Sequence, residues 1–112
     1  MFFHIHIYYT KSTRHIAEEI RKNVIESFPQ IYVSDLVDKE VGPHTKPMFL
    51  LTIKDSDLIF MIPWIMLNRK SLSVLIHPNY NESLLDHTER AMWLGEKLDL
   101  NLESLKEKKR QV

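Results

Sequence analysis

The chain has 112 residues, of which 44% are hydrophobic, so it is long enough to form one domain with its own core. Its 15 basic and 15 acidic residues cancel, which gives no electrostatic footprint for nucleic acid or for an anionic membrane. Because the chain has no cysteine, disulfides, thiolate metal sites and cysteine nucleophiles are excluded.

Residues 2–9 are predicted to form the first strand. Side chains of a strand point to opposite faces with a period of two. One face takes Phe3, Ile5, Ile7 and Tyr9. The other takes His4, His6 and Tyr8. Two imidazoles on one face lie about 7 Å apart and can hold one metal ion. On this segment alone, an edge strand with a solvated polar face is the simpler interpretation.

A helix and two strands are predicted next. Apolar residues recur at helical spacing over residues 16–28, opposite charged residues, and Ser12 is the expected N-cap. A looser alternation predicts a second strand over residues 30–37, and a strongly apolar run predicts a third over residues 48–53. The polar residues 38–46 between them are turn-forming.

The second predicted helix begins at an Asp55 N-cap, and its body, residues 58–67, is apolar nearly all round. Such a helix is buried on more than one side. Pro63 either begins the helix proper or kinks it. The apolar run is about half of the roughly 20 residues that a membrane span needs. The first residues also lack the pattern of a signal peptide, so we expect a cytoplasmic protein.

The last third of the chain is predicted to hold one more strand and two helices. The strand covers residues 72–76 and is closed by His77 and Pro78. Asp86 and Glu89 form a capping-box pattern for a third helix. The residues expected to point inward from it are Ala91, Leu94 and Leu98. A short helix from about residue 101 ends in a charged tail, residues 106–110, which we expect to be solvated.

This order of elements predicts a ferredoxin-like α+β fold, βαββαβ with an antiparallel sheet and a C-terminal helical extension, in a single domain over residues 1–112. The first strand should lie between the third and the fourth, and we expect it to run parallel to the third and antiparallel to the fourth. Helices cover only one face of such a sheet. A ligand, a loop or a partner subunit must therefore cover the other.

Five of the six histidines are expected around one end of this sheet. They are His4 and His6 in the first strand, His44 before the third, His77 at the end of the fourth, and His87 in the turn beyond it. Each alone has an ordinary explanation as a turn residue, a strand end or a helix start. One shared site explains all five more simply. The sixth, His15, is expected to face solvent from the first turn of a helix.

An imidazole cluster without thiolates suits Zn, Fe, Cu or Ni. An open site with about three protein ligands leaves room for a substrate, as catalytic metal sites do. Asp86 and Glu40 are the nearby carboxylates that could complete a facial triad of two histidines and one carboxylate for non-haem iron. Histidines outside the ligand set would orient the ligands or serve as acid and base.

Four segments, in this order, resemble the DOPA 4,5-dioxygenase family. They are His4-Ile-His-Ile-Tyr8; Val41-Gly-Pro-His44 with Pro47 and Phe49; Ser73-Val-Leu-Ile-His77-Pro78; and Asp86-His87-Thr88 followed by Trp93-Leu-Gly95. The likeness runs from residue 4 to about residue 105. Two departures adjoin the expected pocket and bear on the substrate: residues 79–85 lack the Gly- and Asp-containing turn expected there, and position 45 is Thr rather than Pro.

The resemblance implies a dioxygenase-like domain: a metal-dependent extradiol ring-cleaving dioxygenase acting on a catechol such as L-DOPA. It implies a divalent metal, Fe(II) foremost, with zinc or another divalent ion as an alternative in isolated protein. Dioxygen would be the second substrate. The ring would open beside the diol to give a muconate-type semialdehyde, and a histidine outside the ligand set would move the catechol proton.

The expected metal ligands are His6, His44 and His77, with His4 next. His87, His4 and Tyr8 are expected to act in proton transfer or to contact substrate. Trp64, Asn68 and Arg69 are the candidate substrate-binding residues, and Arg69 could meet a substrate carboxylate. The ordinary interpretation places Trp64 in the core and Arg69 in solvent.

The main alternative is a non-catalytic domain that binds a metal or a small ligand on the same scaffold. RNA-recognition modules share this strand order, but they need a basic surface and an RNP-like sequence, so no nucleic-acid partner is expected. No membrane partner is expected either. We expect a homodimer, because an open sheet face and an all-round apolar helix both need cover.

Overall fold

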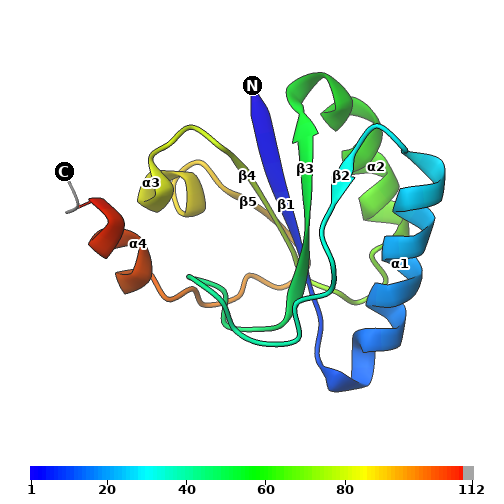
Figure 1. Ribbon diagram of the computed structural model, residues 1–112, viewed down its shortest axis with the longest axis horizontal. Helices are drawn as coiled ribbons and strands as arrows, with labels where there is room; N and C mark the ends of the chain where they lie inside the picture. The colour runs from blue at the N-terminus through cyan, green and yellow to red at the C-terminus, as the bar shows by residue number, and fades with distance from the viewer. Residues whose placement is uncertain (110–112) are drawn as a thin grey trace.

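The computed structural model describes residues 1–109, and the side chains of residues 1–106. Five strands form one sheet, and helices lie on both sides of it (Figure 1). The strands are β1 (Phe2–Tyr8), β2 (Tyr32–Val33), β3 (Met48–Lys54), β4 (Val74–Pro78) and β5 (Met92–Leu94). The α-helices are α1 (Arg14–Ser27), α2 (Leu58–Asn68), α3 (Ser83–His87) and α4 (Glu103–Lys109), and short 3-10 turns (Lys11–Thr13 and Asp55–Asp57) precede α1 and α2.

The strand order is β2-β3-β1-β4-β5, which confirms the predicted fold class and the central place of β1. The predicted direction of β3 is wrong, because β1 runs antiparallel to both neighbours. Helix α1 returns the chain so that β2 runs in the direction of β1, and the connection from β2 then reverses it for β3. Tyr8 at the end of β1 therefore pairs with Met48 at the start of β3.

The two faces of the sheet have different cover. On one face, odd-numbered residues of β1 such as Ile5 and Ile7 are fully buried against α1 and α2, in the larger core. On the other, Tyr8 packs in a smaller core with Met48, Leu75 and Leu98. Its cover is the loop 38–47 and the segment that follows β5, and a loop is one of the three kinds of cover expected for this face.

Helix α1 forms as predicted, with Ala17, Ile20 and Val24 buried at helical spacing. Helix α2 also forms, and the backbone continues through Pro63. The expectation that α2 is buried on more than one side is wrong for the single chain. Met61 and Ile65 are buried, but the residues of the outer face are not. The exposed fractions there are 74% for Ile59, 62% for Phe60, 56% for Met66 and 83% for Leu67.

The predicted third helix is wrong. Asp86 belongs to the short helix α3, and the chain then enters β5, which pairs with β4. The carboxylate of Asp86 accepts hydrogen bonds from the backbone N–H groups of Tyr80 and Glu82, which precede it in the chain. It therefore closes the turn before α3 and does not cap a helix after residue 86, as the capping-box pattern predicted.

Several element boundaries differ from the predicted ones. The second strand is only Tyr32–Val33, with an isolated bridge from Val37 to Met48. The fourth includes His77 and Pro78 instead of ending before them. Thr10 and Lys54, not Ser12 and Asp55, occupy the positions before the two helical segments. The short C-terminal helix is α4, and the last residue of the predicted charged tail, 110, lies outside the described residues.

No helix within residues 1–109 is both long and apolar enough to cross a membrane.

Candidate metal centre

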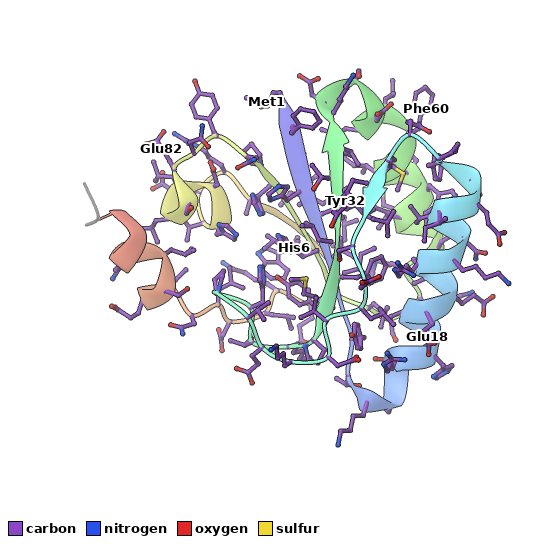
Figure 2. The ribbon with its side chains drawn as sticks, viewed as in Figure 1. Met1, His6, Glu18, Tyr32, Phe60 and Glu82 are labelled. Carbon is purple, nitrogen blue, oxygen red and sulfur yellow. The ribbon has the colours of Figure 1, made fainter. Side chains whose placement is uncertain are left out.

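The five histidines expected to meet do so, over the face of the sheet that the loop 38–47 covers. His4 and His6 project from β1, and His77 projects from β4 directly opposite His4. His6 points into the space between the sheet and the side that carries α3 and α4 (Figure 2). His44 and His87 approach from the loop and from α3. The cluster therefore lies over the middle of a face and not at one rim of the sheet.

The rings are in direct contact with one another. Ring centroids are 4.1 Å apart for His6 and His44, and 4.0 Å apart for His77 and His87. The His6–His77 and His4–His77 separations are 5.2 and 5.3 Å. The five imidazoles thus form one connected group.

His44 reaches this group although β3 begins at the far end of β1. The loop is fixed to the segment after β5 by a bridge between His44 and Leu100 and by the hydroxyl of Thr45, which donates to the Asp99 carbonyl at 2.6 Å. The Tyr8 hydroxyl lies 2.7 Å from Nδ1 of His44. The loop therefore folds back over the sheet, which brings His44 to the cluster by a different route from the one predicted.

Hydrogen bonds to backbone carbonyls orient two of the rings. Nδ1 of His77 donates to the Pro78 carbonyl at 2.8 Å, and Nδ1 of His87 donates to the Ser83 carbonyl at 2.7 Å. Because a neutral imidazole has one N–H, Nε2 of each ring carries a lone pair. Metal-binding histidines in proteins are oriented in the same way, by donating the N–H of the ring nitrogen that does not bind the metal.

His6 has a polar atom without a partner. Its Nε2 lies 3.1 Å from Nε2 of His77. Since the latter carries a lone pair, Nε2–H of His6 donates, which leaves Nδ1 of His6 as a bare lone pair. That atom is buried and has no hydrogen-bond partner within the described residues. Buried polar atoms are nearly always satisfied, so a lone pair in this state fits a donor set that binds a cation.

Two overlapping groups have metal-binding geometry. His4, His6 and His77 offer ring nitrogens within 4.8 Å of one another, and so do His6, His44 and His87. Two nitrogens bound to the same ion at about 2.0–2.1 Å lie at most about 4.2 Å apart, so either group needs only small side-chain movements. All-imidazole donor sets suit Zn, Fe, Cu or Ni.

The environment favours the neutral form of four of these rings, those of His4, His6, His44 and His77. Burial, followed by the neighbouring His87, lowers the pKa of His44 and of His77 to about 4. Burial, followed by the surrounding histidines, holds the pKa of His6 well below its usual value. Burial also lowers the pKa of His4. Lone pairs are therefore available at neutral pH, which is the protonation state that metal binding requires.

Neither candidate carboxylate joins the histidines in the part of the chain that is described. Asp86 is buried, and its oxygens accept from two backbone N–H groups and from Arg90 at 3.1 Å. It holds α3 and so positions His87. Glu40 is exposed and belongs to neither metal-binding group.

The three candidate substrate residues lie elsewhere. Trp64 packs against Phe28 on the helical side of the sheet, with ring centroids 5.8 Å apart. Asn68 donates to the Trp64 carbonyl and Arg69 to the Leu72 carbonyl. The structure does not bring them to the cluster, because α2 covers the opposite face. Tyr8, in contrast, lies at the cluster and stacks on Trp93 at 5.8 Å.

A cavity of about 470 Å³ adjoins the cluster through His87. Its apolar wall is Ala91, Trp93, Leu98, Leu100 and Leu102. Sequence reasoning missed this wall as a site because it expected a helix there. The signal that could have found it is the strand-like Met92-Trp93-Leu94, closed by Gly95 at a φ of +76°.

Two curated proteins are similar to nearly the whole chain. The chain is 34% identical over 120 residues to an uncharacterized 21.2 kDa protein of Botryotinia fuckeliana, covering 97% of this chain and 66% of that one. It is 28% identical over 109 residues to a DOPA 4,5-dioxygenase of Amanita muscaria, covering 92% of this chain and 48% of that one. The chain thus spans about two thirds and about half of the lengths of these curated relatives.

A crystal structure of a candidate dioxygenase from Nostoc punctiforme superimposes with a TM-score of 0.91 at 33% identity, covering 95% of this chain and 91% of that one. The model of the Dopa 4,5-dioxygenase family matches residues 3–104, which include all five clustered histidines. The chain therefore belongs to the Dopa 4,5-dioxygenase family.

Proposed function

We propose that this protein is a metal-dependent extradiol dioxygenase that opens the ring of a catechol such as L-DOPA. The observation that carries the proposal is the buried cluster of neutral imidazoles, with an unpartnered nitrogen on His6, in a member of a dioxygenase family. A cavity large enough for an aromatic substrate opens beside it.

His6, His44 and His87 are the ligand set that we favour for a divalent ion, with Fe(II) first and zinc or another divalent ion as the alternative. An ion held through Nδ1 of His6 gives this buried nitrogen a partner and leaves the hydrogen bond from His6 to His77 in place. His87 lines the cavity, so this set also lies next to the substrate. The other group, with His4 and His77, is the competing assignment.

When bound, the ion supplies the redox and Lewis-acid chemistry that couples dioxygen to the catechol. The reaction balances without a further reductant. One carbon–carbon bond beside the diol breaks, and of the two atoms of dioxygen one enters the new carboxylate and the other the new aldehyde. His4 is only partly buried, so it can accept the catechol proton and pass it to solvent. With Nδ1–H of His44 donating to the phenolic oxygen of Tyr8, the Tyr8 hydroxyl can donate to the substrate.

The test is metal analysis of tag-free protein, followed by anaerobic loading with Fe(II) and measurement of oxygen uptake with catechols. We expect one bound ion, one dioxygen consumed per catechol, and a yellow product. His6→Ala and His87→Ala should lose the ion, His4→Ala should keep it with reduced turnover, and the matched control His15→Ala should change neither. Loss of the ion in His4→Ala but not in His87→Ala would reassign the ligands to the other group.

Tight metal binding with no oxygen uptake for any catechol would refute the enzyme proposal. That outcome would instead support a non-catalytic metal-binding domain on the same scaffold.

We also propose that a second copy of the chain covers the outer face of α2. A fully exposed large apolar side chain presents about 150–200 Å², so Ile59, Phe60, Met66 and Leu67 together expose roughly 500 Å². That is most of the roughly 800 Å² that each partner buries in a stable interface. Sedimentation at micromolar concentration should give a dimer, and Leu67→Glu a monomer. A monomeric wild-type protein at this concentration would refute the proposed dimer.

A further inference from the structure

The cavity beside His87 is lined by an apolar wall and by a charged rim. The wall suits an apolar part of a ligand, and the rim suits a polar part. The wall residue Trp93 is partly buried and offers an aromatic surface next to the cluster. Apolar walls with a few placed polar groups are typical of small-molecule sites, and about 470 Å³ lies within the usual range. The ring of a catechol fits the wall, and the rest of the molecule must then face the rim.

The rim holds one cation and two acids. Lys97 lies there with Glu89 and Asp99, and all three are exposed. Within the described residues, the salt bridges of the chain do not include Lys97. Of these three side chains, only Lys97 can pair with a carboxylate of a ligand, and the two acids beside it disfavour any further negative charge on that ligand.

Arg69, the residue expected to meet a substrate carboxylate, is otherwise engaged. Its Nη1 donates to the Leu72 carbonyl at 2.9 Å. The guanidinium also packs against Gly95, where an added Cβ would lie 2.5 Å from Nη1. Arg69 does not line the cavity beside His87, whereas Lys97, two residues after Gly95, does.

We propose that Lys97 determines specificity by pairing with a single carboxylate on the side chain of an aromatic substrate whose ring lies against Trp93. This inference rests on the proposed function for the identity of the ring as a catechol. It predicts that the protein discriminates catechols by the charge of the substituent and that the discrimination is lost with Lys97.

The test is anaerobic calorimetry of the metal-loaded protein with three probes: 3,4-dihydroxyphenylacetate, dopamine and unsubstituted catechol. Exposed ion pairs contribute about 2- to 5-fold in affinity. Lys97→Met should weaken binding of the carboxylate probe by about this factor and leave catechol unchanged. Lys97→Glu should weaken it by about 10-fold and favour dopamine. Lys22→Met, on the exposed side of α1, is the matched control and should change nothing.

Ala91→Phe provides an independent measurement, because it fills the cavity from its wall and should weaken all three probes while circular dichroism stays native. The inference would be overturned if the Lys97 variants bound the carboxylate probe as tightly as the wild-type protein does. It would also be overturned if Ala91→Phe bound all three probes with unchanged affinity. Binding is measured without turnover, so the two proposals fail separately. Lys97-dependent binding without oxygen uptake removes the enzyme function alone, and oxygen uptake indifferent to Lys97 and to substituent charge removes the specificity role alone.

Discussion

Acidification of the metal-free protein should destabilise it through the buried histidines. The pKa values of His44 and His77 are about 4 in the folded chain, against about 6.5 for an unperturbed imidazole. Between these values the unfolded chain binds more protons than the folded one. The free energy of unfolding therefore falls as pH decreases from about 6.5, and this loss is complete near pH 4.

The magnitude follows from the same two pKa values. Between pH 7 and pH 5, each ring contributes a loss of about 2 kcal/mol, so the pair contributes at most about 4 kcal/mol. That is a large part of the roughly 5–15 kcal/mol typical of a domain. With a urea m-value of about 1–2 kcal/mol/M, the unfolding midpoint should drop by about 2–4 M.

The assay is urea unfolding at pH 7, 6 and 5 in the presence of a chelator, followed by circular dichroism. His77→Gln should reduce the loss of stability between pH 7 and pH 5 by about 2 kcal/mol, the share that His77 contributes, whatever its effect on stability at pH 7. His15→Gln is the matched control, since His15 is exposed on α1 and should leave the dependence intact. Equal midpoints at pH 5 and pH 7 in the wild-type protein would refute the reasoning, and so would a full pH dependence in His77→Gln.

Two further predictions concern single atoms of the structure. Tyr8→Phe should keep the stacking on Trp93 and the bound ion but remove the 2.7 Å contact with His44. The kcat should therefore fall by about 10-fold or more at unchanged metal content. An unchanged kcat would show that Tyr8 has no role in the mechanism. Gly42→Ala and Gly95→Ala both force a methyl group onto a positive φ, at a cost of about 1–2 kcal/mol. Only at Gly95 must the new Cβ also displace a side chain, the Arg69 guanidinium, which donates to the Leu72 carbonyl. Urea unfolding should therefore show a loss larger by about 1 kcal/mol at Gly95, the worth of that hydrogen bond, and equal losses would contradict this.

The sequence was sufficient to predict the fold class and the shared face of His4 and His6, because both depend on short-range patterns. Alternation in β1 assigns His4 and His6 to one face, and the helical periodicity of α1 assigns the other face to the core. The direction of β3 was predicted wrongly, and yet His44 joined the cluster. Its position depends on the path of the loop 38–47, which is fixed by contacts with residues more than fifty positions later in the chain.

The substrate region could not be predicted for a related reason. The segment after Asp86 carries a capping-box pattern, and only the backbone contacts of the Asp86 carboxylate show that the chain turns into a strand instead. The side chains of Trp64 and Arg69 suit an aromatic substrate with a carboxylate, but Trp64 lies in α2, which packs on the opposite face, and Arg69 directly follows this helix. Side-chain chemistry alone does not assign a face when the element that carries the residue is apolar all round.

The alternation of β1 has a consequence for mutability. The odd positions from Phe3 to Ile7 pack in the larger core, and His4 and His6 at even positions belong to the imidazole cluster. Tyr8, also at an even position, contacts the cluster and packs in the smaller core. Libraries that randomise His4 and His6 but keep Tyr8 can therefore search for new chemistry while both cores keep their packing. A one-residue insertion or deletion in β1 would exchange the two faces of the strand. The imidazoles would then point toward the helices, and the aliphatic side chains would point toward the metal-binding face.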